Sequence, residues 1–255
     1  MPLNLQEKYR LEQAKWNALA PADVSASMVL PPNANFETHA RQSSLYVGVL
    51  EFLGDLCGEQ VLEYGCGLGE LATLLAKSGA QVTAFDLAPR SVRIAQRRAK
   101  LNQVEASVKL MVAAGEHVPF ADESFGVIVG KAILHHLDVN VGWSDLYRVL
   151  KRGGRAVFIE PMGMNPILNF VRDHVPYRHK HPRGADSPLI YAEIHEWGRP
   201  FEKFSYREIQ LLSMLERGLG FRRRISQFRR LDALLLERLP WLRRYCRYVV
   251  MYCAK

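Results

Sequence analysis

An apolar run that passes directly into a glycine-rich turn constrains the fold of this 255-residue chain most strongly. Val61–Tyr64 has the composition of a short buried strand, and Leu68–Lys77 has that of the helix that follows it. Glycines at 65, 67 and 69 allow a bulky ligand to approach the backbone, and the first amides of the helix favour an anionic group on that ligand. The pattern predicts a nucleotide-type binding turn between a strand and a helix.

The spacing of this turn distinguishes two kinds of nucleotide site. A dinucleotide turn needs glycine or alanine at the last position of G-x-G-x-x-G/A, where this chain has Glu70. Glu63 stands two residues before the first glycine, and a carboxylate there suits a cationic amine better than a pyrophosphate. Asp86 ends the next apolar run, where a carboxylate can accept hydrogen bonds from both hydroxyls of a ribose.

Short apolar runs alternate with helical segments through the middle of the chain. Strands separated by helices of 10–15 residues indicate βαβ units, and their right-handed crossovers place ligands at the carboxyl ends of parallel strands. We therefore expect an α/β fold with a doubly wound, mostly parallel sheet of seven strands. Five strands are expected at 61–64, 81–85, 108–112, 127–129 and 156–159, with helices at 68–77, 89–101 and 143–150.

Four segments are expected along the chain. Residues 1–58 form an N-terminal helical cap, 59–160 the α/β core, 161–204 a lid or substrate insertion, and 205–255 a C-terminal helix with the closing strands of the same sheet. In the cap, helices are expected near residues 9–16 and over 36–56. In the last segment we expect a helix at 206–219, strands at 221–228 and 245–253, and between these strands a short amphipathic helix with Leu231, Leu234, Leu235 and Leu239 on one face.

Five motifs follow one another in a fixed order: VLEYGCGLGE, FDLAP, AGEHVPFADESF, ILHHL and RVLKRGG. Over residues 40–160 they make the chain resemble the class I S-adenosylmethionine (SAM)-dependent methyltransferase family, in particular its subgroup that acts on small molecules. The resemblance implies a Rossmann-like fold, SAM as the methyl donor and a small-molecule acceptor. Two positions depart from the family pattern, because Ala114 and Gly126 stand where acidic residues are common.

The resemblance also assigns roles to individual residues of the donor site. It implies that Glu63 lies near the methionine amine, that Asp86 holds the ribose and that Leu87 packs on the adenine. Gly115 and Glu116 would flank the adenine edge. The remaining donor-site residues implied are Gly65, Cys66, Gly67 and Gly69 around the methionine tail, and Lys131, Ala132 and His136 near the sulfonium.

Methyl transfer needs alignment of the acceptor with the methyl group and exclusion of water, and it needs a general base only when the acceptor must lose a proton. His135, His136 and Glu160 are the candidates for that base, because they follow the fourth and fifth strands. The alternative for the histidines is packing or loop fixing. The alternative for Glu160 is a hydrogen bond that holds the loop 161–163.

Aromatic residues outside the core suggest a cap over the site. If the N-terminal helix and the insertion fold over the sheet edge, the site would be covered by Tyr9, Trp16, Trp197, Phe201 and Phe204. Such a cover would suit an apolar or aromatic acceptor. Ordinary packing is the alternative.

Composition narrows the class of protein further. No apolar stretch reaches 18 residues, the N-terminus lacks a signal-peptide pattern, and four cysteines without paired spacing suggest reduced thiols, so a cytoplasmic protein is expected. His179 and His181 lack an accompanying carboxylate cluster, and no metal site is expected.

The formal net charge of +8 arises in one segment. Between Arg217 and Arg247 ten arginines face only Asp232 and Glu237. This segment could contact an anionic membrane surface or RNA, or it could be a solvated face. The site lacks the Asn/Asp-Pro-Pro-Tyr/Phe tetrad of many nucleic-acid methyltransferases, which argues against RNA. A protein that binds SAM without catalysis is a further alternative, and the sequence predicts no oligomeric state.

Overall fold

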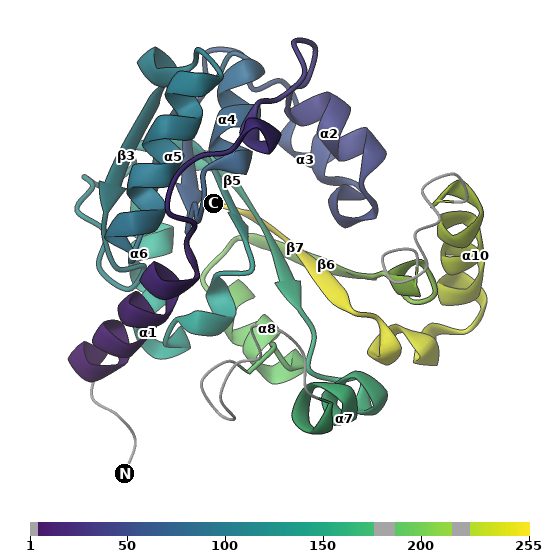
Figure 1. The fold of residues 1–255 in the computed structure, drawn as a ribbon. Helices are drawn as coiled ribbons and strands as arrows, with labels where there is room; N and C mark the ends of the chain where they lie inside the picture. Colours follow the sequence, from purple (N-terminus) through teal and green to yellow (C-terminus); the bar gives the residue numbers. More distant parts are fainter. Residues whose placement is uncertain (1–4, 176–186, 216–224) are drawn as a thin grey trace.

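The computed structural model describes residues 5–175, 187–215 and 225–255, and within them the chain builds one seven-stranded sheet (Figure 1). The strand order is β3-β2-β1-β4-β5-β7-β6. All neighbours are parallel except β7, which runs antiparallel to both β5 and β6, so the predicted mostly parallel sheet is confirmed. The strands are β1 Gln60–Tyr64, β2 Gln81–Asp86, β3 Val108–Val112, β4 Phe125–Lys131, β5 Leu150–Pro161, β6 Lys203–Ile209 and β7 Tyr248–Ala254.

Helices cover both faces of this sheet, as a doubly wound fold requires. Alternate residues of β1 belong to different cores: Val61 packs with α2 to α5, whereas Leu62 and Tyr64 pack with α6 and α8. The helices are α1 Leu5–Leu19, α2 Phe36–Gln42, α3 Val49–Leu53, α4 Glu70–Lys77, α5 Pro89–Leu101, α6 Val139–Val149, α7 Pro166–His174, α8 Tyr191–Gly198 and α10 Ile225–Arg238. None of the described helices is long and apolar enough to cross a bilayer.

The N-terminal cap differs from the prediction in one respect. The single helix expected over 36–56 is divided into α2, a 3-10 turn at Ser44–Tyr46, and α3. Ser43 ends α2 because its backbone is extended, and Gly48 begins α3 from a left-handed conformation with φ of 76°.

The last segment differs more. The helix predicted over 206–219 is wrong for its first residues, because 203–209 form β6 and pair with β7 along their whole length, and 216–219 lie outside the described residues. This pairing between distant residues outweighs the helical preference of the local sequence. The strand predicted at 221–228 is also wrong where it is described, since 225–228 lie in α10, and 221–224 fall outside the described residues. The closing strand expected at 245–253 is confirmed as β7.

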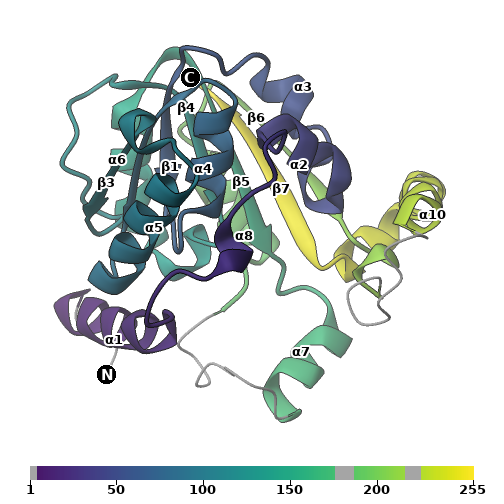
Figure 2. The same cartoon turned by 45° about the horizontal axis from the view of Figure 1, so that its top comes forward.

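Helix α1 lies across the edge of the sheet at which the parallel strands end. Figure 2 shows α1 below α5, next to the first turns of that helix. Because parallel strands bring their carboxyl ends to one edge, α1 covers the place where this fold binds ligands.

Candidate functional site

A cavity of about 250 Å³ opens at the carboxyl ends of β1, β2 and β4. Its wall combines the glycine turn, the end of β2, the segment after β3 and one face of α1. The cavity contains most of the residues predicted from the sequence to hold the donor: Gly65, Gly67, Asp86, Leu87, Gly115, Glu116, Lys131, Ala132 and His136. Three other predicted residues, Glu63, Cys66 and Gly69, lie around the turn but outside this lining.

The glycines of the turn are required for two different reasons. All three have a positive φ, at 75° for Gly65, 49° for Gly67 and 72° for Gly69. A Cβ at Gly65 would lie 2.7 Å from Ile133, and one at Gly69 would lie 2.7 Å from Ala95, so close packing excludes a side chain at both. A Cβ at Gly67 would have nothing within 4 Å. Gly67 therefore borders open space on the cavity side, where a ligand can approach the backbone.

Cys66 holds the turn to the neighbouring strand. Its amide donates a hydrogen bond to the carbonyl of Phe85 at 2.8 Å, and its side chain is buried. Burial raises the pKa of its thiol well above the ordinary value, which keeps the sulfur neutral. The role of Cys66 in this geometry is to fix the backbone of the turn.

Asp86 joins the turn to the end of β2. Its Oδ2 accepts a hydrogen bond from the Gly67 amide at 2.8 Å, and its Oδ1 accepts one from the Ala88 amide at 2.9 Å. Burial raises the pKa of Asp86, while the two amides act in the opposite direction. A carboxylate oxygen can accept more than one hydrogen bond, so both oxygens retain capacity for ligand hydroxyls in the cavity.

Glu63 is the least satisfied carboxylate of the region. It is 4% exposed, and its Oε2 has no hydrogen-bond partner in the part of the chain that the structure describes. Burial raises the pKa of Glu63 well above the ordinary value, and the nearby carboxylates of Asp86 and Glu70 add to this. A hydrogen bond from the backbone of Ala72 and the charge of Lys131 act against this rise in pKa. A buried carboxylate in this state is stabilised by a cation that arrives next to it.

Helix α1 closes the cavity with polar contacts. The Tyr9 hydroxyl donates to Oε2 of Glu116 at 3.0 Å, and Gln13 Nε2 donates to the Leu87 carbonyl at 2.9 Å. Trp16 also lines the cavity, and its ring nitrogen donates to Oε2 of Glu12 at 2.7 Å. The two α1 aromatics predicted to cap the site, Tyr9 and Trp16, are therefore at the site.

The other predicted aromatic cap residues are elsewhere. Trp197 is 1% exposed and packs in the core against Gly142 of α6, whose Cβ would lie 2.8 Å from its ring. Phe201 is buried in the same core, and Phe204 packs against it. The cap prediction is wrong for these three residues, because α8, which carries Trp197, packs on the sheet face with α6, and Phe204 belongs to β6.

The three candidate bases occupy different environments. Glu160 is fully buried: its Oε1 accepts from the amides of Ile133 and Leu134, both at 2.9 Å, and its Oε2 lies 2.6 Å from Nδ1 of His135. His136 is the only one of the three in the cavity lining, and its Nδ1 lies 3.7 Å from Oε2 of Glu12. Glu160 thus fixes the loop after β4, whereas His136 faces the space where a ligand would bind.

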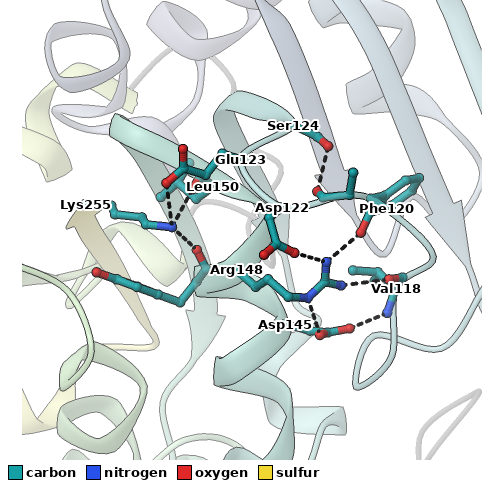
Figure 3. A network of polar contacts seen from close by, with 11 residues as sticks. Val118, Phe120, Asp122, Glu123, Ser124, Asp145, Arg148, Leu150 and Lys255 are labelled. Carbon is teal, nitrogen blue, oxygen red and sulfur yellow. Dashed lines mark hydrogen bonds and ion pairs between the residues drawn. The ribbon is translucent and has the colours of Figure 1, made fainter.

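A polar network outside the cavity holds the segment that carries Glu116 (Figure 3). Arg148 binds Oδ1 of Asp145 at 2.9 Å and Oδ1 of Asp122 at 2.9 Å, and donates to the carbonyls of Phe120 and Val118. Oδ2 of Asp145 accepts from the Val118 amide at 2.7 Å. These contacts fix the segment after β3 against α6.

The sequence analysis does not identify several site residues of α1. Lys8, Glu12 and Gln13 contact the site from α1. With Tyr9 and Trp16 they recur at intervals of three and four residues, a helical-face pattern that the sequence contains. His179 and His181 lie outside the described residues, and no group of three metal-ligating side chains occurs in the described part.

Comparison with known proteins agrees with this geometry. A family profile described as "Methyltransferase domain" matches residues 62–158. Demethylmenaquinone methyltransferase of Chlorobaculum parvum is 36% identical over 112 residues, which are 43% of this chain and 44% of that protein. Three further demethylmenaquinone methyltransferases are also matched over less than half of their own length.

A longer match and a solved structure extend the likeness. Ubiquinone biosynthesis O-methyltransferase of Albidiferax ferrireducens is 30% identical over 194 residues, 68% of each chain. Geranyl diphosphate C-methyltransferase of Streptomyces coelicolor, solved with S-adenosyl-L-homocysteine, shares the fold with a TM-score of 0.64, 16% identity and 99% coverage of both chains. The motifs, the fold and the longer match together show that this chain belongs to the class I SAM-dependent methyltransferase family.

Proposed function

We propose that this protein transfers the methyl group of SAM to a small apolar or aromatic acceptor of the quinone-precursor kind. The observation that carries the proposal is the buried, unpartnered Oε2 of Glu63 beside a glycine turn. SAM has a cationic amine at one end and a ribose in the middle, and this chain offers a carboxylate for each. The donor set therefore fits SAM.

Within this proposal each part of the donor has its own contacts. Glu63 accepts from the amine, the turn at Gly67 borders the methionine tail, and Asp86 accepts from the ribose hydroxyls. Leu87 and Gly115 border the adenine in the cavity wall. Bound SAM supplies a methyl group that is already activated by the positive charge of its sulfur.

The remaining residues orient the reactants and exclude water. Tyr9 and Gln13 hold α1 over the cavity, and an enclosed site strengthens every charge interaction inside it. His136 accepts a proton at a ring nitrogen when the acceptor is a hydroxyl, since it lines the cavity. Glu160 positions the loop that carries His136 through the amides of Ile133 and Leu134.

The acceptor class is supported by two observations. The cavity wall has an apolar part, which is formed by Trp16, Phe85, Ile133 and Leu137. Several relatives are enzymes of menaquinone and ubiquinone biosynthesis by name. Such acceptors are ring compounds with hydroxyl groups, and their aromatic faces suit an apolar wall.

Two measurements test the proposal. Calorimetry with S-adenosylhomocysteine should give a binding heat, and incubation with SAM and a short-chain demethylmenaquinone or a hydroxylated benzoquinone precursor should release S-adenosylhomocysteine. Absence of any binding heat would refute the donor site. Binding without product release from either acceptor would refute the acceptor class and favour a protein that only binds the nucleoside.

A further inference from the structure

A surface of mixed apolar and basic character lies outside the donor site. It is formed by α7 and by the 3-10 turn Pro240–Tyr245 that precedes β7, and we call it the α7 face. Ile167 is 67% exposed, Phe170 61% and Trp241 62%, although large apolar side chains are normally covered. Exposed arginines flank them at 238, 243 and 244.

The two parts of the α7 face are joined rigidly. Asn165 is buried and caps α7 by accepting from the amides of Ile167 and Leu168, at 2.9 and 3.1 Å. Its Nδ2 donates to the carbonyl of Tyr245 at 2.6 Å. In both views α7 projects away from the body of the sheet, and Figure 1 draws it below the yellow turn before β7 (Figures 1 and 2). Asn165 therefore holds the start of α7 against the end of the turn that carries Trp241.

One arginine of this surface contacts the backbone, since Nε of Arg243 donates to the Leu236 carbonyl at 3.4 Å. Arg238, Arg243 and Arg244 form no salt bridge with any residue in the described ranges. The guanidinium of Arg244 lies over the ring of Tyr245 at 5.7 Å, and the rings of Trp241 and Tyr245 meet edge to face at 6.2 Å. Amphipathic aromatic rings next to cationic side chains are typical of protein segments that lie at the boundary of lipid headgroups and acyl chains.

We propose that the α7 face docks on an anionic lipid bilayer. The exposed arginines at 238, 243 and 244 complement anionic headgroups. The apolar area that enters the acyl boundary is supplied by Phe170, Ile167 and Trp241. α7 follows the carboxyl end of β5, which is the edge of the sheet that bears the donor cavity. Docking there would bring a lipid-like acceptor to the site, a consequence that rests on the proposed function, whereas the docking itself does not.

Vesicle co-sedimentation tests the proposal with the whole chain. The protein should bind phosphatidylcholine vesicles that contain about one third phosphatidylglycerol, bind pure phosphatidylcholine far less, and dissociate as salt is added. Arg243→Gln with Arg244→Gln should weaken binding about thirtyfold. Phe170→Ala with Trp241→Ala should weaken it at least about tenfold.

Matched variants elsewhere separate docking from general effects of charge or apolar area. Arg93→Gln with Lys100→Gln removes two exposed cations of α5, and Leu101→Ala removes an exposed apolar side chain of the same helix. Both should change vesicle binding by less than about twofold. An equal loss in these variants, or wild-type protein that ignores anionic vesicles, would overturn the proposal.

Two further measurements complete the test. Sedimentation velocity reports whether Phe170 and Trp241 instead hold two copies together, and a dimer that their replacement dissociates, without vesicle binding, also overturns the proposal. Calorimetry with S-adenosylhomocysteine on each variant shows that the donor site is intact. Vesicle binding without nucleoside binding would refute the proposed function and support the docking surface. Nucleoside binding without vesicle binding would refute the docking surface and leave the proposed function intact.

Discussion

Replacing Glu63 with glutamine tests the electrostatic part of the donor site directly. The substitution keeps the size of the side chain and removes its charge, and no described residue forms a hydrogen bond to Oε2 that would be lost. If the carboxylate holds the cationic amine of the donor, its loss affects binding more than folding. We therefore expect weaker binding of S-adenosylhomocysteine without loss of stability.

The size of the effect follows from the burial of the site. A hydrogen bond to a charged group contributes about 1.5–3 kcal/mol, and Glu63 is 4% exposed, so solvent screens the interaction little. This corresponds to an affinity about ten- to 150-fold weaker in Glu63→Gln. Glu105→Gln, at an exposed position, is the control and should bind as the wild type does.

The ligand-free protein gives an independent signature of the same charge. Burial raises the folded-state pKa of Glu63 above its ordinary value of 4.5, so the contribution of Glu63 to the stability of the wild type is largest below that value. It declines as pH rises from there towards the raised pKa, because the unfolded chain ionises first. Glu63→Gln lacks this decline, and the stability of the variant relative to wild type should increase as pH rises above 4.5 in urea titrations.

Calorimetry in buffers of different ionisation enthalpy completes the test. Donor binding to the wild type should release protons from Glu63, and binding to Glu63→Gln should release fewer. An unchanged affinity together with unchanged proton release would refute the assignment of Glu63 to the amine, whatever the fate of the other contacts.

Three further outcomes are expected. Asp86→Ala should weaken S-adenosylhomocysteine binding at least about tenfold in calorimetry, since it removes the ribose acceptor and frees the Gly67 amide; unaltered affinity would exclude that role. Glu160→Ala should lower the free energy of unfolding by about 2–4 kcal/mol in urea titrations, because two buried amides lose their acceptor. Glu160→Gln should retain most of the wild-type kcat, whereas a base would lose activity in both variants. Arg148→Met should destabilise the fold by about 1–2 kcal/mol with little change in donor affinity, and a selective loss of affinity would contradict a purely structural network.

The donor site could be predicted from sequence because its chemistry requires particular residues within short spans. The three glycines have positive φ in one turn, and Asp86 reaches that turn through a single hydrogen bond to Gly67. Such requirements are local in sequence, and strands ending at one edge bring them together. The order of the motifs then specified the parallel part of the sheet.

The elements that were missed are defined by contacts between distant residues. β6 is an edge strand whose only neighbour is β7, and its arginine and glutamate favour a helix when the segment is considered alone. Trp197 is an aromatic residue outside the predicted sheet, so the sequence is compatible with a cap over the site. Only the packing of α8 against α6 shows that this side chain belongs to the core. The sequence leaves two roles open for Glu160, a base or a hydrogen bond to the loop 161–163. Its partners in the structure lie more than twenty residues away, in the loop after β4.

Helix α1 contributes to the proposed chemistry because it forms one wall of the donor cavity. A carboxylate and a cation attract each other strongly only where water is kept away, and the glycine turn alone does not close the cavity. α1 closes it with a few polar contacts, chiefly Tyr9 to Glu116 and Gln13 to the Leu87 carbonyl. Each such contact contributes only about 1 kcal/mol, and Asn17 adds a further one by accepting from the Arg90 amide at the start of α5. On the proposed function, α1 in this position excludes water from the bound donor.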